Sequence, residues 1–233
     1  MKRLGYLLWD LLYWPVAALP GPIGRTLRGY LFRLVLKECG TNVIFDTGVA
    51  IENPQFVTIK NNCWIDRQAI IIAGPITSRG RKLTRLAAYI YGDNEHVAEG
   101  EVVIAQNCHI GPQTVVQGHG GVYVGPDVTI AAGSKVYSVV HDHMNRSDRS
   151  DTTLYKFSSM APEAEQSLLV GPVHIGTAAA VGLNAIVLPG VRLGHGAWLG
   201  AGSLAARDIP DNAIAVGSPA KVTRTRIAPE ASS

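Results

Sequence analysis

A six-residue period of aliphatic and small side chains restricts the fold more than any other feature of the chain. In "IGTAAAVGLNAIVLPGVRLGHGAWLGAGSLA", residues 175–205, the period is carried without a slip by Ile175, Val181, Val187, Leu193, Leu199 and Ala205. Six steps turn an α-helix by about 240°, so these side chains would be spread over three sides of a helix. Glycines and a proline interrupt any long strand. The period therefore argues against long helices and long strands alike.

The same period occurs earlier in the chain. Its earlier positions are Ile59, Ile65 and Ile71, then Ile104, Ile110, Val116 and Val122, and, after a shift of two across the "GHGG" of residues 118–121, Val124, Ile130 and Val136. Four residues after most of these positions stands a small side chain, including Cys63 and Cys108. This is the pattern of a parallel β-helix, in which each hexad forms one side of a triangular coil and points its aliphatic residue inward. The two cysteines are then expected to be small buried residues.

Composition agrees with many short elements joined by turns. The chain of 233 residues contains 25 Gly and 13 Pro and has a formal net charge of only +3, so it does not indicate a nucleic-acid-binding protein. Three widely spaced cysteines do not form a disulfide framework and fit a reducing compartment. We therefore expect a cytoplasmic protein.

Residues 1–42 are predicted to form an apolar and amphipathic helical segment. The first run, "LGYLLWDLLYWPVAALP", ends at Pro20 and is too short for a comfortable span of about 20 apolar residues. The second, "GRTLRGYLFRLVLK", combines helical apolar spacing with Tyr and Arg, which are typical of interfacial helices. Two alternatives stay open: residues 1–38 contact the inner face of the cytoplasmic membrane, or they cap the domain that follows.

Two segments interrupt the period inside the expected β-helix domain, residues 43–222. Residues 77–100 are basic and then acidic, and residues 141–172 are polar and irregular. Loops of this length inside a compact repeat are usually functional or disordered. Residues 223–233 are expected to form a C-terminal tail.

One stretch carries a family resemblance. Residues 172–222, "PVHIGTAAAVGLNAIVLPGVRLGHGAWLGAGSLAARDIPDNAIAVGSPAKV", resemble the C-terminal half of the hexapeptide-repeat acyltransferases, and within them are most similar to bacterial surface-polysaccharide and sugar O-acetyltransferases. The resemblance implies a mainly β chain folded as a left-handed parallel β-helix. It also implies a homotrimer with active sites between neighbouring prisms, acetyl-CoA as cosubstrate, a saccharide acceptor and no metal.

The family places a histidine where the loop leaves the prism, and "SVVHDHMNRSD" offers His141 and His143 at that point. Transfer of acetyl from a thioester to a hydroxyl needs a base, and histidine with an ordinary pKa of about 6.5 suits that role near neutral pH. His141 is the favoured base because the coil holds it, with His143 and Asp142 as further catalytic candidates. Asn145, Arg146 and His119, the last at the register shift, are candidates for binding the acceptor.

For acetyl-CoA the resemblance implies late turns of the prism and its closing turn. These candidates are Gly182, Ala201, Gly202, Val216, Gly217, Ser218, Pro219, Ala220, Lys221 and Arg224. The two basic residues would meet the phosphates of coenzyme A, since ammonium and guanidinium groups pair with phosphate oxygens. The remaining histidines, His96, His109, His174 and His195, are expected at exposed structural positions.

Other functions remain possible on the same prism. The acceptor atom could be nitrogen, as in a sugar N-acetyltransferase, or the hydroxyl could belong to serine. A zinc enzyme of the γ-carbonic-anhydrase kind would need three converging histidines, for which His119, His141 and His143 are available. A non-catalytic scaffold that recruits partners through its N-terminal helices is the last alternative.

Overall fold

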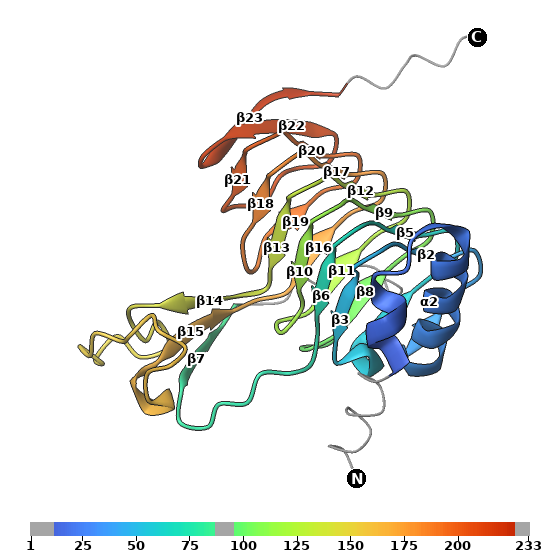
Figure 1. Ribbon diagram of the computed structural model, residues 1–233. Helices are drawn as coiled ribbons and strands as arrows, with labels where there is room; N and C mark the ends of the chain where they lie inside the picture. Colours follow the sequence, from blue (N-terminus) through green and yellow to red (C-terminus); the bar gives the residue numbers. More distant parts are fainter. Residues whose placement is uncertain (1–11, 87–95, 227–233) are drawn as a thin grey trace.

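The computed structural model describes residues 12–86 and 96–226 and shows a triangular prism of stacked coils (Figure 1). Each coil contributes one short strand to each of three faces. The first face contains β1 (Glu38–Cys39), β4 (Val57–Ile59), β8 (Val102–Ile104), β11 (Val122–Val124), β16 (Val173–Ile175) and β19 (Arg192–Leu193). The second contains β2 (Ile44–Phe45), β5 (Trp64–Ile65), β9 (His109–Ile110), β12 (Thr129–Ile130), β17 (Ala180–Val181), β20 (Trp198–Leu199), β22 (Ala213–Gly217) and β23 (Ala220–Thr225). The third contains β3 (Ala50–Glu52), β6 (Ile70–Ile72), β10 (Val115–Gln117), β13 (Lys135–Tyr137), β18 (Ile186–Val187) and β21 (Leu204–Ala205).

All strand pairs within the three faces are parallel except the closing hairpin of β22 and β23. The predicted left-handed parallel β-helix is confirmed. Every aliphatic position of the six-residue period is buried, from Ile59 to Ala205, and fills the interior of the prism. Cys63 and Cys108 are buried there too, and each thiol donates to a backbone carbonyl of a neighbouring coil.

Each coil turns its corners through residues with positive φ. At the corner between the first and second faces, four such residues from successive coils are Asn42, Asn62, Asn107 and Asp127. Their side chains form a hydrogen-bonded ladder, with N···O distances of 2.6, 2.9 and 2.8 Å. Asn and Asp tolerate this left-handed conformation better than other residues with a side chain. These residues therefore supply the backbone conformation that the turn needs, and their side chains are hydrogen-bond partners for one another.

The prism extends slightly beyond the limits expected from sequence. Strand β1 already pairs with β4 at residues 38–39, before the expected start at residue 43. At the other end β23 continues to Thr225, into the segment expected to be a tail. The parts of the predicted N-terminal segment and C-terminal tail that fall on residues 1–11 and 227–233 lie outside the described residues.

The N-terminal end of the prism is covered by helical residues 12–17 and by α2 (Gly21–Val35). The helix buries Gly24, Arg28 and Phe32. Arg28 is fully buried, and its guanidinium donates to the carbonyl oxygens of Phe45, Val16 and Leu19 at 2.9, 2.9 and 2.7 Å. One arginine thus ties together the helix, the segment before it and the first coil.

Among residues 12–86 and 96–226, no helix combines the length and the apolar character that crossing a bilayer requires.

We expect Arg28→Ala to lower the free energy of unfolding by about 3 kcal/mol, because it leaves buried carbonyl oxygens without donors. Gly29→Ala is the matched control in the same helix. A Cβ at Gly29 meets no atom within 4 Å, so the substitution should stabilise the helix by about 1 kcal/mol. Urea unfolding followed by circular dichroism measures both changes. Equal stability of the wild type and Arg28→Ala would show that the helix is not anchored by this residue.

Candidate active site

The third corner of the prism, between the third and first faces, carries both long excursions. The first leaves after β6 and returns at β8, and the second leaves after β13 and returns at β16. Between them lies the "GHGG" turn, which joins β10 to β11. Since β6, β10 and β13 are neighbours in the third face, His119 occupies the corner between the roots of the two excursions.

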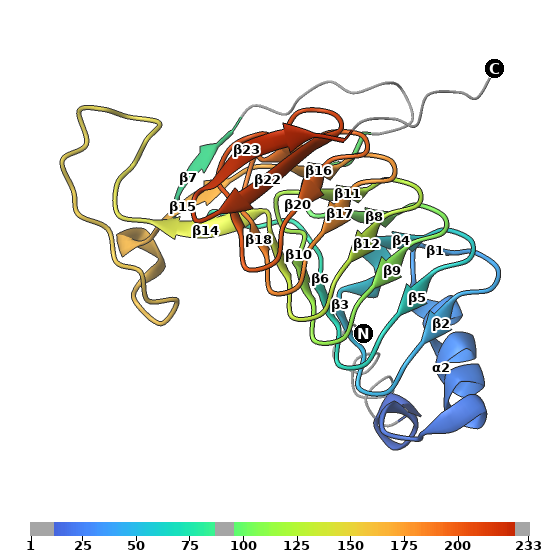
Figure 2. The ribbon, with the colours of Figure 1, turned by 90° about the horizontal axis from the view of Figure 1, so that it is seen from above.

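The two excursions form one small sheet beside the prism (Figures 1 and 2). Strand β15 (Ser167–Val170) pairs antiparallel with β14 (Val139–Asp142) and parallel with β7 (Lys82–Arg85). A satellite apolar cluster of Val139, Leu168 and Val170, with Ile76 and Leu83, holds the sheet together. Nothing in the composition of the two excursions indicates that they pair.

A cavity of about 250 Å³ lies where this sheet meets the third corner. It is lined by Ile76, Arg81, Gln117, His119, Val139, Val140, His141, Ser159, Gln166 and Leu168. The prism supplies Gln117 and His119, and the excursions supply the other residues. The cavity therefore brings together His119 and His141, which were predicted for different roles.

His119 is oriented by the backbone of the neighbouring coil. Its Nδ1 lies 2.7 Å from the carbonyl oxygen of Gly74. A carbonyl oxygen only accepts hydrogen bonds, so Nδ1 carries the proton and donates it. In the neutral ring the lone pair is then on Nε2.

His141 has a different arrangement. Its Nε2 lies 3.1 Å from the hydroxyl oxygen of Ser159, and its buried Nδ1 has no hydrogen-bond partner. Burial lowers the pKa of His141 below its ordinary value, and the positive charge of Arg81 lowers it further. His141 is therefore neutral at pH 7.

Arg81 and Gln166 form the polar wall of the cavity opposite the prism. Arg81 Nε donates to Gln166 Oε1 at 2.9 Å, and its NH2 lies 2.9 Å from Glu163 Oε1. Glu163 belongs to the short 3-10 helix η2 (Glu163–Glu165). The guanidinium is thus held by both a neutral and a charged partner from the second excursion.

Two buried polar atoms in the cavity lining have no partner within the described residues: Gln117 Oε1 and His141 Nδ1. An unpaired buried polar group costs about 1–3 kcal/mol. Both lie on the same cavity, so a ligand with hydroxyl or amine groups would relieve this cost. The lining thus has the properties of a small polar-ligand site.

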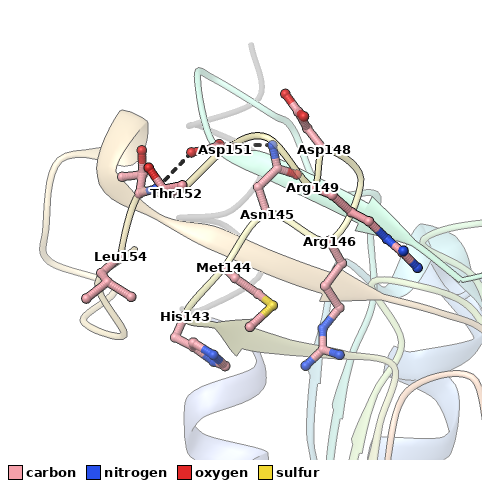
Figure 3. A pocket seen from close by; sticks show the side chains of 10 residues that line it. His143, Met144, Asn145, Arg146, Asp148, Arg149, Asp151, Thr152 and Leu154 are labelled. Atoms are coloured by element: carbon pink, nitrogen blue, oxygen red, sulfur yellow. Dashed lines mark hydrogen bonds between the residues drawn. The ribbon is translucent and has the colours of Figure 1, made fainter.

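The other residues predicted for the site lie outside this cavity. His143, Asn145 and Arg146 line an open hollow of about 630 Å³ within the second excursion (Figure 3). Asp142, which is 4% exposed, contacts two of these residues. Its carboxylate forms an ion pair with Arg146, and its Oδ1 lies 3.3 Å from His143 Nδ1. Burial alone would raise the pKa of Asp142, but the hydrogen bond and charge of Arg146 and nearby backbone donors lower it below its ordinary value. Asp142 orients His143 and Arg146, and among the described residues its carboxylate contacts these two side chains and not the ring of His141.

The residues predicted for acetyl-CoA lie mainly at the second corner, between the second and third faces. Gly182, Ala201 and Gly202 occupy the turns that follow β17 and β20, and these strands are neighbours. Residues 216–220 form the tip of the β22–β23 hairpin, and its turn contains the cis Ser218–Pro219 bond. Lys221 and Arg224 are exposed on β23. In one chain these residues form a column of their own, at a different corner from the histidine cavity.

Sequence reasoning missed Arg81, Gln117, Ser159 and Gln166. The basic start of the first excursion was the only sign of Arg81, and nothing in the period distinguished Gln117 from other residues at its place in a coil. One expectation about the other histidines was wrong. His174 is only 4% exposed, because Tyr123 from the neighbouring coil stacks on its ring at 4.9 Å.

Within residues 12–86 and 96–226, no group of three His, Cys, Asp or Glu residues could hold a metal ion. Of the three histidines considered for a zinc site, His119 and His141 line the same cavity, and His143 does not.

The chain matches no known family model. It is 50% identical over 54 residues to a provisionally named acetyltransferase of Staphylococcus aureus, and this stretch is 23% of the chain and 27% of that protein. It is 31% identical over 130 residues to the galactoside O-acetyltransferase of Lactococcus lactis, which is 52% of the chain and 61% of that enzyme. The chain thus spans about a quarter of the first relatives and less than two thirds of the last.

Solved structures share the fold. AntD, an N-acyltransferase from Bacillus cereus in complex with dTDP and 3-hydroxybutyryl-CoA, superposes with a TM-score of 0.65 at 21% identity over 86% of this chain and 88% of AntD. The hexapeptide-repeat acetyltransferase VCA0836 of Vibrio cholerae, in complex with acetyl-CoA, gives 0.52 at 14% identity over 93% of this chain and 84% of VCA0836.

The predicted resemblance is confirmed: the chain is related in sequence to acetyltransferases and has the left-handed β-helix of the hexapeptide-repeat acyltransferase superfamily.

Proposed function

We propose that the protein is an acetyltransferase that transfers acetyl from acetyl-CoA to a hydroxyl group of a saccharide. The observation that carries this proposal is the cavity at the third corner. It holds two histidines, one of them with a defined tautomer, and two buried polar atoms that need a polar ligand. A surface-polysaccharide or lipid-linked sugar is the class of acceptor that we expect from the resemblance.

The reaction needs a base and no covalent intermediate. A histidine accepts the proton of the acceptor hydroxyl while the oxygen attacks the thioester carbonyl carbon. The carbon–sulfur bond then breaks, and the imidazolium returns its proton to the thiolate of coenzyme A. The sequence-based candidate for the base is His141, which burial and Arg81 keep neutral at pH 7, with His143 and Asp142 beside it on the second excursion.

The relatives support acyl transfer to a sugar and leave two acceptor atoms to compare. The Lactococcus enzyme is named an O-acetyltransferase and AntD an N-acyltransferase. We favour oxygen because the chain is 31% identical to the former and 21% identical to the latter over the matched residues. An ester product is released by mild hydroxylamine, whereas an amide product resists it, so product chemistry tests the assignment directly.

We further propose a homotrimer in which acetyl-CoA lies between neighbouring prisms. One chain carries the expected coenzyme turns and the histidine cavity at different corners, and a cyclic arrangement would set the turns of one chain beside the cavity of the next. Lys221 and Arg224 would meet the phosphates, while His119, Asn145 and Arg146 would meet the acceptor.

We propose that α2 and the residues before it contact the inner face of the cytoplasmic membrane. The helix covers the prism with one face and exposes an apolar stripe on the other, made of Ile23, Leu27, Tyr30 and Leu34. Ile23 and Leu34 are 71% and 80% exposed, and Trp14 nearby is 82% exposed. Apolar residues on one face with Trp and Tyr are typical of helices that lie in a membrane interface.

Calorimetric titration with acetyl-CoA is expected to show saturable binding with about one site per chain. Lys221→Glu combined with Arg224→Glu should weaken binding at least tenfold, because charge-assisted hydrogen bonds contribute about 1.5–3 kcal/mol each. Arg67→Glu, an exposed arginine on an early coil, is the matched control and should bind as the wild type does. Folded wild-type protein that binds no acetyl-CoA would contradict the proposed function, and its zinc content would then be measured.

Sedimentation with vesicles tests the membrane contact. The wild type should sediment with vesicles containing phosphatidylglycerol, and Ile23→Ser with Leu34→Ser should reduce the bound fraction severalfold because the double change removes two exposed apolar anchors. Val222→Ser removes an apolar side chain that is 50% exposed on β23 at the other end of the prism, and should bind like the wild type. Equal sedimentation of all three proteins would rule out this use of the helix.

A further inference from the structure

We propose that His119, on the prism, is the base that accepts the acceptor's proton, and that His141 contacts the acceptor instead. This inference rests on the proposed acetyltransferase function and changes the residue that the sequence favoured. It is drawn from the arrangement of the two rings in their shared cavity.

The tautomer of His119 suits it to act as the base. A general base must present a lone pair, and a partner on the other ring nitrogen normally holds the ring in place. The Gly74 carbonyl, 2.7 Å from Nδ1, does this for His119 and leaves the lone pair on Nε2. None of residues 12–86 and 96–226 forms a hydrogen bond with Nε2, so this nitrogen is available to a ligand in the cavity.

His141 has neither a free lone pair nor a partner that holds its other ring nitrogen. Its Nδ1 is buried and has no acceptor beside it, so nothing holds that side of the ring. Its other nitrogen, Nε2, is engaged by the Ser159 hydroxyl. A proton taken up by His141 would produce a cation with one unpaired N–H in a buried position, next to Arg81.

The turn that carries His119 is rigid. It is fixed by backbone bonds from Gly118 to Ile72 and from Gly121 to Gly118, and Gly120 donates to Ser138 Oγ at 2.8 Å. A Cβ on Gly118 would lie 2.2 Å from Val102, and one on Gly120 would lie 2.4 Å from the Ser138 carbonyl oxygen. Close packing on both sides thus requires glycine and holds His119 in place. A base held by a rigid element is positioned more accurately than one on an excursion.

Gln117 supplies a second contact on the same corner. Its unpartnered Oε1 can accept a hydrogen bond from a hydroxyl adjacent to the one that reacts. Two hydroxyl groups on neighbouring carbons of a sugar ring would then meet Gln117 Oε1 and His119 Nε2. The ligand class is a polyol with vicinal hydroxyls.

The proton balance is complete within the cavity. His119 Nε2 takes the hydroxyl proton as the oxygen–carbon bond forms, and gives it to the coenzyme A sulfur as the carbon–sulfur bond breaks. The charged and titratable groups that line the cavity or pair with its lining are Arg81 and its partner Glu163, from the two excursions, and His141 on β14. The Glu163 carboxylate offsets the charge of Arg81 while the His119 imidazolium exists.

The test compares His119→Asn with His141→Gln. Asparagine places an amide N–H where Nδ1 stands and so keeps the donor to Gly74, but it has no basic nitrogen. Glutamine likewise keeps a polar group near Ser159 without basicity. Both are assayed with acetyl-CoA and the sugar, from a panel of hexoses and nucleotide-linked hexoses, that the wild type acetylates fastest.

We expect His119→Asn to lower kcat on the order of 100-fold or more, with unchanged acetyl-CoA affinity, and to abolish the fall in rate below neutral pH that protonation of a base produces. His141→Gln should mainly raise the KM for the sugar and keep that acid limb. Loss of the acid limb in His141→Gln, or its retention in a folded and active His119→Asn, would overturn the assignment. The pH profile of His141→Gln tests the assignment of the base even if His119→Asn does not fold. A wild type that binds no acetyl-CoA would overturn the proposed function itself, and the assignment with it.

Discussion

The need to turn each coil at its corners within a few residues governs the rest of this structure. A six-residue side leaves room for two or three paired residues and a turn, and the turn is possible only with a residue in the left-handed region. At the first corner Asn42, Asn62, Asn107 and Asp127 take this conformation in succession, and their side chains bond to one another along the prism. Insertions can then leave only at a corner without breaking the parallel ladders.

Both excursions leave from the third corner, and this explains how a regular column acquires an irregular site. The turn that carries His119 belongs to the coil between those that carry the excursions, so any sheet that joins the excursions must close over it. The cavity therefore has a floor from the prism and a wall from β14, β15 and loop residues of both excursions. Rigid positioning comes from the floor, and the polar groups that surround a ligand come mostly from the wall.

The fold could be predicted from sequence because each hexad depends on local spacing. Every sixth residue from Ile175 to Ala205 is buried in the prism, and this regular burial is what produces the six-residue period in the sequence. The site could be predicted only in part, because its key contacts join distant residues that no period relates. Gly74 and His119 are 45 positions apart, and Arg81 and Gln166 are 85 apart. His174 was misjudged for the same reason, since its burial depends on Tyr123 in the coil beside it.

The two cavity histidines also differ in the groups that surround their rings, in a way that favours one proton acceptor. Arg81 lowers the pKa of His141, so protonation of that ring is opposed by both burial and charge. His119 lies on the prism, and its Nδ1 donates a hydrogen bond to the Gly74 carbonyl oxygen. A neutral His141 can then exchange hydrogen bonds with the acceptor throughout the reaction, and the proton that the reaction transfers has one place to go.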